Sequence, residues 1–508
     1  MHTPWQVRLG NRKSRNQRYE CLMAFPAYRN VIVILDSTIK EVNLLTLTKH
    51  YLLNSILVIL CLNTFLLFAN SEWKVTENLP VCTAKNAQHF PVLTSDGKNG
   101  VIIAWRDAQN GNYDVFAQRM AETGEILWDA NGIAICDHNS SQSAPVIVLD
   151  STGGAIVVWG DTRNGSQDIF AQRIDANGKK LWQKNGISVC TEPALQDDIS
   201  AITDGNGGVI IVWEDWRSGN QDIYTQKISA DGKPVWNQNG IPVYNGKGDQ
   251  YDPTLVSDGE GGAIFVWWDI STPDWDILAQ HIDSKGNAVW KTPIPVCTAK
   301  GNQGGPTIVA DGNGGVFCVW PDYRNDPNIL TTAQLYAQHI DANGKALWQK
   351  NGIPICNVKA NQQQQACISD GNGGFIVVWW DDRDIFADIY AQRVNVKGKL
   401  LWNKIGVHVC TAGGVQQNPK LVPDGAEGAI IYWLDYRQDF GNSTEDAIYA
   451  QRIDANGLPL WQENGIPVCD AEKQQISPMA IATGNGSAFV VWSDARGKDH
   501  DIYIHKVQ

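Results

Sequence analysis

DGNGGVIIVWEDWRSGNQDIYTQKISADGKPVWNQNGIPV, residues 204–243, recurs with small changes along most of the 508-residue chain. Each copy carries two Trp, and the first of them ends an apolar run such as VIIVW. The first Trp of each copy stands 53, 54 or 59 residues after the previous one, at Trp105, Trp159, Trp213, Trp267, Trp320, Trp379, Trp433 and Trp492. A repeat of this length indicates an architecture in which each unit packs on the next.

Each repeat reads as four short strands. In the second repeat, Pro145–Asp150 and Ala155–Trp159 flank a Gly-rich turn, and Asp168–Asp175 alternates outward and inward residues with period two. Asn177-Gly178 is typical of a tight hairpin turn before the fourth strand. Eight units of four antiparallel strands predict an all-β fold, an eight-bladed β-propeller.

The two ends of the repeat region complement each other. Residues 73–82 match only the tail of a repeat, and the last repeat stops at DIYIHKVQ, residues 501–508. We therefore expect the N-terminal segment to supply the outermost strand of the eighth blade, which closes the ring without an exposed edge. The alternative, an open solenoid, would need capping units at its ends.

The consensus DGxGGxIxVWxDxRxGxxDIYAQRIDxxGxxLWxxNGIPVC resembles repeats of exported bacterial β-propeller proteins over Trp73 to Gln508. The resemblance implies the fold and export but no particular activity. The turn DANGKKLW, residues 175–182, is loosely similar to the Asp-box of sialidase-type propellers. Its spacing from Gly to Trp is one residue too long, so sialidase activity is not carried over.

The segment before the repeats predicts export. Residues 1–50 do not match the repeat, and an uncharged apolar run at residues 51–69 follows Lys49 and His50. A basic flank, an apolar run and the small residue Ala69 are typical of a signal peptide, although the run is also long enough for an uncleaved membrane anchor. We thus expect a single propeller domain at residues 70–508 in a secreted, periplasmic or cell-surface protein.

Charge and motifs limit the partners. The net charge of −13 disfavours a broad electrostatic grip on nucleic acid or on an anionic membrane. The DGNGG turns offer too few oxygen ligands for Ca²⁺, and no phosphate-binding loop follows a strand. We therefore predict a monomer with no metal, no cofactor and no nucleic-acid partner, which contacts a membrane only through residues 51–69 if they are retained.

Most repeated polar residues are interpreted as structural. All eight repeats place an Asp two residues after the first Trp, and six place an Arg two residues further on. Such a pair can bond to itself and to its loop, which explains eightfold use without a ligand. Seven Cys share one repeat position, and equivalent points on neighbouring sheets lie too far apart for disulfides, so we expect unpaired core thiols at Cys82, Cys136, Cys190, Cys297, Cys356, Cys410 and Cys469.

A repeated Gln leaves two readings open. It stands about three residues before each innermost strand, at Gln88, Gln142, Gln196, Gln250, Gln303, Gln363, Gln416 and Gln475. Each side chain could bond the backbone of a neighbouring blade. Alternatively, the ring could hold water, an ion or a sugar at one end of the central channel, with Gln196 and Gln250 as candidate ligand contacts.

Function is expected where the repeat is broken, on the face of the W-x-D-x-R loops and the blade-to-blade connections. Two insertions fall there, at residues 325–333 and 438–445. Exposed aromatic side chains beside polar ones would suit a glycan or a protein ligand. The candidates are Trp216, Trp275, Tyr323 and Tyr436, each of which could instead pack over its own loop.

Asp198 and Asp252 are the candidate catalytic residues, because they hold the same repeat position in adjacent blades. Paired carboxylates could serve glycoside hydrolysis or bind a cation. No Ser-His-Asp signature or H-E-x-x-H helix is present. We therefore predict an exported binding protein for a glycan or protein ligand, with two alternatives: a glycoside-active enzyme with carboxylates at the channel mouth, and a purely structural envelope component.

Overall fold

The computed structural model describes residues 19–25, 28–35, 77–326, 331–437 and 446–508. The chain divides into two units, Met1–Glu72 and Trp73–Gln508. In the first unit, β1 (Tyr19–Phe25) pairs with β2 (Tyr28–Leu35) as an antiparallel hairpin. The apolar run at residues 51–69 lies outside the described residues. No described residue belongs to a helix long and apolar enough to cross a membrane.

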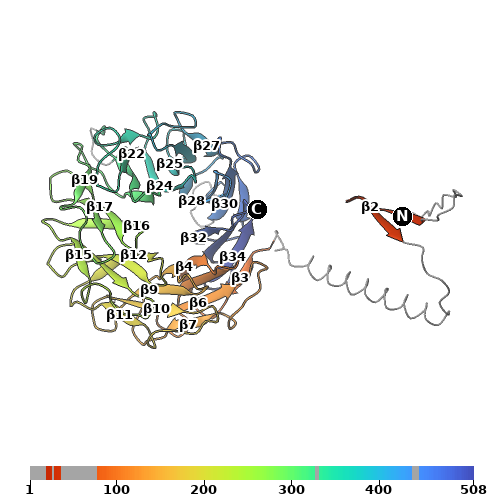
Figure 1. Ribbon diagram of the computed structural model, residues 1–508, viewed down its shortest axis with the longest axis horizontal. Helices are drawn as coiled ribbons and strands as arrows, with labels where there is room; N and C mark the ends of the chain where they lie inside the picture. Colours follow the sequence, from red (N-terminus) through yellow and green to blue (C-terminus); the bar gives the residue numbers. More distant parts are fainter. Residues whose placement is uncertain (1–18, 26–27, 36–76, 327–330, 438–445) are drawn as a thin grey trace. The chain divides into compact units, whose positions relative to one another are not determined.

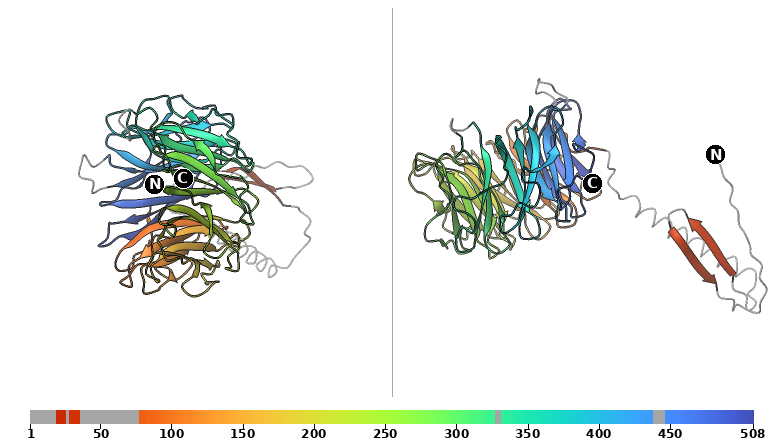
Figure 2. Two further views of the ribbon diagram at one scale, coloured as in Figure 1. Left: turned by 90° about the vertical axis from the view of Figure 1, so that its left-hand side faces the viewer. Right: turned by 90° about the horizontal axis from the view of Figure 1, so that it is seen from above.

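The second unit is a ring of eight four-stranded antiparallel sheets, seen down its axis in Figure 1 and from two sides in Figure 2. The innermost strands, from the first blade to the eighth, are β4 (Gln88–Ser95), β8 (Val146–Leu149), β12 (Gln196–Thr203), β16 (Gln250–Ser257), β20 (Thr307–Ala310), β24 (Gln362–Ser369), β28 (Gln416–Pro423) and β32 (Gln475–Ala482). The second strands are β5 (Val101–Asp107), β9 (Ala155–Asp161), β13 (Val209–Asp215), β17 (Ala263–Asp269), β21 (Val316–Asp322), β25 (Phe375–Asp381), β29 (Ala429–Asp435) and β33 (Ala488–Asp494).

The two outer positions complete each blade. The third strands are β6 (Asp114–Met120), β10 (Asp168–Ile174), β14 (Asp222–Ile228), β18 (Asp276–Ile282), β22 (Gln334–Ile340), β26 (Asp388–Val394), β30 (Ala447–Ile453) and β34 (Asp501–Val507). The outermost strands are β7 (Ile133–Cys136), β11 (Ile187–Cys190), β15 (Ile241–Tyr244), β19 (Ile294–Cys297), β23 (Ile353–Pro354), β27 (Val407–Cys410), β31 (Ile466–Cys469) and, for the eighth blade, β3 (Leu79–Cys82).

The ring closes as the sequence predicts. β3 pairs antiparallel with β34, so the first propeller strand in the sequence completes the sheet that holds the last one (Figure 1). Val81 and Cys82 of β3 are buried together with Ile502 and Ile504 of β34. The predicted all-β eight-bladed propeller with N-terminal closure is therefore confirmed.

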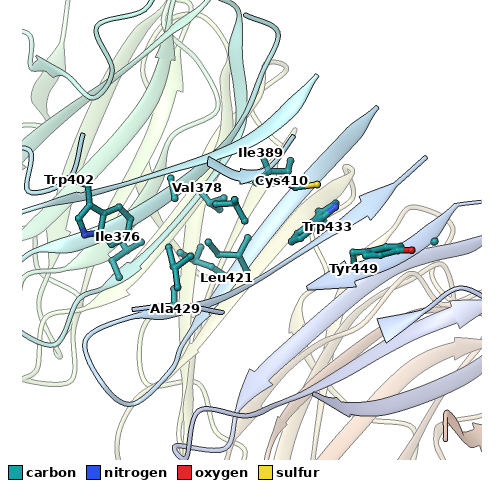
Figure 3. Close-up of a cluster of buried hydrophobic side chains, with 14 residues drawn as sticks. Ile376, Val378, Ile389, Trp402, Cys410, Leu421, Ala429, Trp433 and Tyr449 are labelled. Carbon is teal, nitrogen blue, oxygen red and sulfur yellow. The ribbon is translucent and has the colours of Figure 1, made fainter. Parts of the chain in front are cut away.

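The core lies between the blades. Each of eight buried apolar clusters among the described residues combines side chains from two neighbouring blades. In the cluster drawn in Figure 3, Ile376 and Val378 of β25 meet Leu421 of β28 and Trp433 of β29. This packing explains why the apolar residues of the repeat recur eight times, since each blade buries one face on the next.

The W-x-D-x-R motif forms a closed set of hydrogen bonds. In the third blade, the indole Nε1 of the buried Trp213 donates to Oδ2 of Asp215 at 2.7 Å. Arg217 donates from Nη2 to Oδ2 of that Asp at 2.6 Å and from Nε to Oδ1 at 2.8 Å. The fully buried carboxylate of Asp215 thus accepts charge-assisted hydrogen bonds from Arg217. This is the structural role that the sequence predicts for the repeated Asp and Arg.

The same Arg contacts three further repeated residues. Nη2 of Arg217 lies 3.1 Å from Sγ of Cys190 and donates to the backbone oxygen of Asn239 at 3.0 Å. Its guanidinium lies 4.0 Å from the ring centroid of Tyr224. Burial raises the pKa of the Cys190 thiol to about 12. The seven thiols of this repeat position are free cysteines, as predicted.

Candidate ligand-binding site on the loop face

The loop face is the face that carries the W-x-D-x-R loops and the blade-to-blade connections. Three repeat positions there differ in chemistry from blade to blade: the residue after the first Trp, the residue after the repeated Gln and the residue before the third strand. Within a blade the first two positions stand opposite each other, as in the pairs Glu214–Asp197 and Trp268–Tyr251. Side chains alternate along a strand, so Glu214 points away from the face that Trp213 and Asp215 share.

These three positions define the variable ring. From the first blade to the eighth, the residue after the Trp is Arg106, Gly160, Glu214, Trp268, Pro321, Trp380, Leu434 and Ser493. The residue after the Gln is His89, Ser143, Asp197, Tyr251, Gly304, Gln363, Gln417 and Ile476. The residue before the third strand is Tyr113, Gln167, Gln221, Trp275, Ala333, Ala387, Asp446 and His500.

Three carboxylates converge where the third blade meets the fourth. The acidic groups of Asp198, Glu214 and Asp252 each offer an oxygen within 4.8 Å of the others, with Glu214 buried and both Asp side chains exposed. β12 and β16 are bulged just after the Gln, and Asp198 and Asp252 take φ values of 47° and 49° there. Such a bulge re-aims a side chain, and here it brings two Asp from adjacent blades together.

Hydrogen bonds hold this group in place. Oε1 of Glu214 accepts the backbone N–H of Asp252 at 2.9 Å, and Gln221 donates to Oε2 of Glu214. The indole Nε1 of Trp268 donates to Oδ2 of Asp252 at 2.6 Å. Glu214 therefore links the two blades, while Asp198 and Asp252 present oxygens to solvent.

Two carboxyls of the group hold protons unusually tightly. Although the Asp198 side chain reaches solvent, the protein around its base partly desolvates the carboxyl, and this desolvation, with the charges of Asp252 and Asp197, raises the pKa of Asp198 to about 6. Burial raises the pKa of Glu214 to about 7, and the charge of Asp198 adds to that shift. Carboxyl groups whose pKa values lie well above the ordinary range are concentrated at functional sites, where several like charges lie close together.

An aromatic stack adjoins the carboxylates in the fourth blade. The rings of Tyr251 and Trp268 stack with centroids 4.5 Å apart, and those of Trp268 and Trp275 lie 4.8 Å apart. All three side chains are half-buried. The stack therefore offers an apolar surface beside charged oxygens, a combination that suits the apolar faces and the hydroxyl groups of a sugar.

The other predicted aromatics lie elsewhere on the loop face. Trp216 is 38% exposed. The hydroxyl of Tyr323 accepts a bond of 3.2 Å from the amide of Gln363, and that of Tyr436 accepts one of 2.8 Å from Gln417. The structure thus brings Trp275, Asp198 and Asp252 together but not Tyr323 or Tyr436, whose hydroxyls bond variable-ring amides of the sixth and seventh blades. Residues 327–330 and 438–445 of the two insertions are outside the described residues.

The repeated Gln is buried and bonds the backbone of the blade connections. Gln196 and Gln250 are fully buried, and their amides donate to the backbone oxygens of Ala194 at 2.9 Å and Gly248 at 3.0 Å. The backbone N–H of Gln250 also donates to the preceding blade, at the backbone oxygen of Gln221. Oε1 of each side chain is buried and has no hydrogen-bond partner among the described residues, so the bonds to the backbone account for only the amide nitrogen of each Gln.

One member of the predicted Gln ring is corrected by one residue. In the sixth blade Gln362, not Gln363, pairs with the motif residue Asp381 and is fully buried. The chain carries four consecutive Gln here, so the sequence alone does not show which one is equivalent to the others.

Sequence reasoning missed Glu214 and Trp268. Both occupy the variable letter of W-x-D, which reads R, G, E, W, P, W, L and S around the ring. That variation was the available signal, since the flanking Trp and Asp never change. The three carboxylates could also share a divalent cation, although Ca²⁺ prefers six to eight oxygens, so water would have to supply the others.

Comparisons with known proteins find only distant structural likenesses. No protein-family model matches the chain, and no curated protein matches it. Among solved structures, a Dyadobacter fermentans protein of unknown function is 12% identical, with 85% of this chain and 98% of that chain covered and a TM-score of 0.39. The polysaccharide lyase Uly1 is 11% identical, with 76% and 93% covered and a TM-score of 0.43. A Fusarium graminearum α-L-arabinofuranosidase of family GH93 is 10% identical, with 62% and 93% covered and a TM-score of 0.35. Likeness this distant carries no argument about a ligand.

Proposed function

We propose that the protein binds a carbohydrate on the loop face, at the junction of the third and fourth blades. The observation that carries the proposal is the continuity of the aromatic stack with the carboxylates, through the bond from Trp268 to Asp252. A sugar has apolar C–H faces and hydroxyl edges. The ring of Trp275 suits the faces, and the oxygens of Asp198 and Asp252 suit the hydroxyls.

The test is glycan binding by the purified chain, measured on a glycan array and then by titration of tryptophan fluorescence. Trp275→Ala and Asp252→Asn should each weaken binding by about tenfold or more, which corresponds to about 1.4 kcal/mol. Trp380→Ala is the matched control, because Trp380 holds the repeat position of Trp268 but lies in the sixth blade. Equal loss in all three variants, or binding to no glycan, would contradict the proposal.

Glycoside hydrolysis is the second candidate, favoured by the proximity of three carboxyls and by the pKa values of about 6 and about 7 for Asp198 and Glu214. Retaining glycosidases hold their two carboxyl groups about 5–5.5 Å apart. The exposed pair fits these roles: protonated Asp198 would donate its proton to the leaving oxygen while Asp252 forms the glycosyl ester, and water would then hydrolyse that ester.

Hydrolysis and binding are separable by experiment. Asp198→Asn should abolish release of a chromophore from nitrophenyl glycosides, whereas it should weaken glycan binding by no more than Asp252→Asn does, which is about tenfold. No release by the unmodified chain across a panel of such glycosides would remove this candidate and leave the binding proposal intact.

Export remains part of the proposal. We infer from the apolar run at residues 51–69 that the protein meets its ligand outside the cytoplasm. Cell fractionation with an antibody against the propeller tests this, and a chain found only in the cytoplasm would contradict it.

A further inference from the structure

Arg106 is the exception among the arginines of the described propeller residues. Ten of the eleven pair with a carboxylate, namely Arg119, Arg163, Arg173, Arg217, Arg324, Arg383, Arg393, Arg437, Arg452 and Arg496. Arg106 has no such partner among the described residues, and its buried Nε has no hydrogen-bond acceptor there. Its guanidinium lies 3.5 Å from the ring centroid of Tyr113.

Two histidines accompany Arg106. His89 stands opposite it in the pairing of β4 with β5. The ring of His500, from the eighth blade, lies 4.8 Å from the ring of His89. The backbone oxygen of His500 accepts the N–H of Gln88 at 2.8 Å, which fixes the two blades together at this point. Arg106, His89, Tyr113 and His500 all belong to the variable ring, so we call these four residues the basic group.

No carboxylate among the described residues pairs with Arg106, so the basic group has no counter-charge in this part of the chain. Burial lowers the pKa of His89, and the nearby His500 and Arg106 lower it further. Burial also lowers the pKa of Arg106, and the group with the largest opposing effect is the hydroxyl of Tyr113 rather than a carboxylate. A partly buried guanidinium without an acceptor is unfavourable, because its lost hydration is not replaced by protein oxygens. An anion bound beside Arg106 would supply the missing acceptor oxygens.

We propose that the basic group binds an oxyanion, the carboxylate or sulfate group of a ligand that reaches the loop face between the eighth and first blades. Tyr113 holds the guanidinium from one side, so that its N–H fork is presented as a preformed binding element. The imidazole of His89 supplies a further N–H donor, whereas Nδ1 of His500 lies 3.4 Å from Oγ of Ser493, so only Nε2 of His500 is left for the anion. This inference does not rest on carbohydrate binding at the third and fourth blades, since it uses different residues and different blades.

The experiment is an NMR titration of the full chain with ¹³C,¹⁵N-labelled histidine. Sodium sulfate and sodium acetate are added in separate series, with sodium chloride holding the ionic strength constant. His89→Gln and His500→Gln assign the two resonances. We expect both to shift saturably with at least one anion, and the tighter of the two identifies a tetrahedral or a planar group as the preferred ligand. Absence of a saturable shift with both anions would overturn the proposal.

Variants locate the site. Arg106→Gln should weaken anion binding at least tenfold, and Arg106→Lys should weaken it less because it keeps the charge but loses the fork. Lys98→Gln is the control, since it removes the same charge from an exposed turn of the first blade. If Arg106→Gln binds as tightly as the unmodified chain, Arg106 is not the binding element and the proposal fails. If Arg106→Gln does not fold, the titration of the unmodified chain and of Arg106→Lys still decides the question.

Discussion

The indole nitrogen of Trp268 lies 2.6 Å from Oδ2 of Asp252, and this bond connects the aromatic stack of the fourth blade to the carboxylates at its edge. One side chain thereby serves two purposes: its ring stacks on Tyr251, and its N–H fixes an exposed carboxylate. The two contributions are separable, because phenylalanine keeps a ring but has no N–H.

Trp268→Phe should therefore weaken glycan binding less than Trp268→Ala. A hydrogen bond to a charged group contributes about 1.5–3 kcal/mol to stability. Glycan binding loses only the part that comes from the greater mobility of Asp252, so we expect Trp268→Phe to lower the affinity about fivefold. Loss of the ring as well should exceed about twentyfold. Fluorescence titration of both variants measures this, and equal affinities for the two would show that stacking on Trp268 does not contribute.

Glu214→Gln should change how stability depends on pH. The folded-state pKa of Glu214, about 7, lies above its ordinary value of 4.5, so the folded protein holds this proton more tightly than the unfolded chain. Its ionisation therefore lowers stability as pH rises from about 4.5 to about 7. The variant lacks this ionisation. It should gain on the order of 1 kcal/mol relative to the unmodified chain over that interval, because one unit of pKa shift is worth about 1.4 kcal/mol and the three carboxyls share the effect.

Urea unfolding of both proteins at pH 4.5, 6 and 8 checks this prediction. Glu260→Gln serves as the control, since Glu260 is an exposed carboxyl on the turn between β16 and β17 of the neighbouring blade. A difference in unfolding free energy that stays constant from pH 4.5 to pH 8 would show that Glu214 does not retain its proton.

The features that could be predicted from the sequence are those that depend on the repeat. Trp213, Asp215 and Arg217 recur around the ring, so their structural role and the eight-bladed fold followed from spacing alone. Asp198 and Asp252 hold one repeat position in neighbouring blades, so their proximity also followed. A periodic pattern reports the positions that all blades share, so it places any two residues that hold the same position in neighbouring blades.

The remainder depends on what single blades do differently. Glu214 reaches Asp252 because only the third blade carries Glu after its Trp, whereas the bulge after the Gln recurs in six blades. Gln196 stood at the expected end of the ring, but its burial depends on how the blade connection folds over it. Arg106 became distinctive only when every other arginine of the described propeller residues had been placed against a carboxylate.

Arg217→Gln should destabilise the propeller. It leaves the fully buried carboxylate of Asp215 without its cation, and breaking a buried ion pair from one side is unfavourable by about 3–5 kcal/mol. Since the Arg217 side chain is 19% exposed and solvent screens part of the interaction, we expect the free energy of unfolding to fall by about 2 kcal/mol. Lys247→Gln, which removes the same charge from an exposed residue nearby, should stay within about 0.5 kcal/mol. Equal thermal stability of the two variants would contradict the structural role of the W-x-D-x-R network.

The repeated thiols should be chemically inert in the folded protein. Burial raises the pKa of Cys190, Cys297 and Cys410 to about 12, so at pH 8 on the order of one thiol in 1,000 or fewer is ionised. Iodoacetamide should therefore label these residues much more slowly in the native chain than in 6 M guanidinium chloride, as read by mass spectrometry of peptides. Labelling at similar rates in both conditions would mean that the blades open readily.

Closure of the ring should depend on one face of β3. Val81 is 1% exposed and packs against β34, whereas the neighbouring Pro80 is exposed. Val81→Asp would bury an unpaired carboxylate at the seam between the first and last strands of the propeller, so we expect a loss of about 3 kcal/mol or more. Pro80→Asp places the same side chain in solvent and should change stability by less than about 0.5 kcal/mol. Thermal unfolding measures both, and sedimentation velocity shows whether release of β3 exposes the edge of β34 to another molecule, since an unpaired edge strand recruits a second chain. If Val81→Asp unfolds at the same temperature as Pro80→Asp and stays monodisperse, the pairing of β3 with β34 does not hold the ring closed.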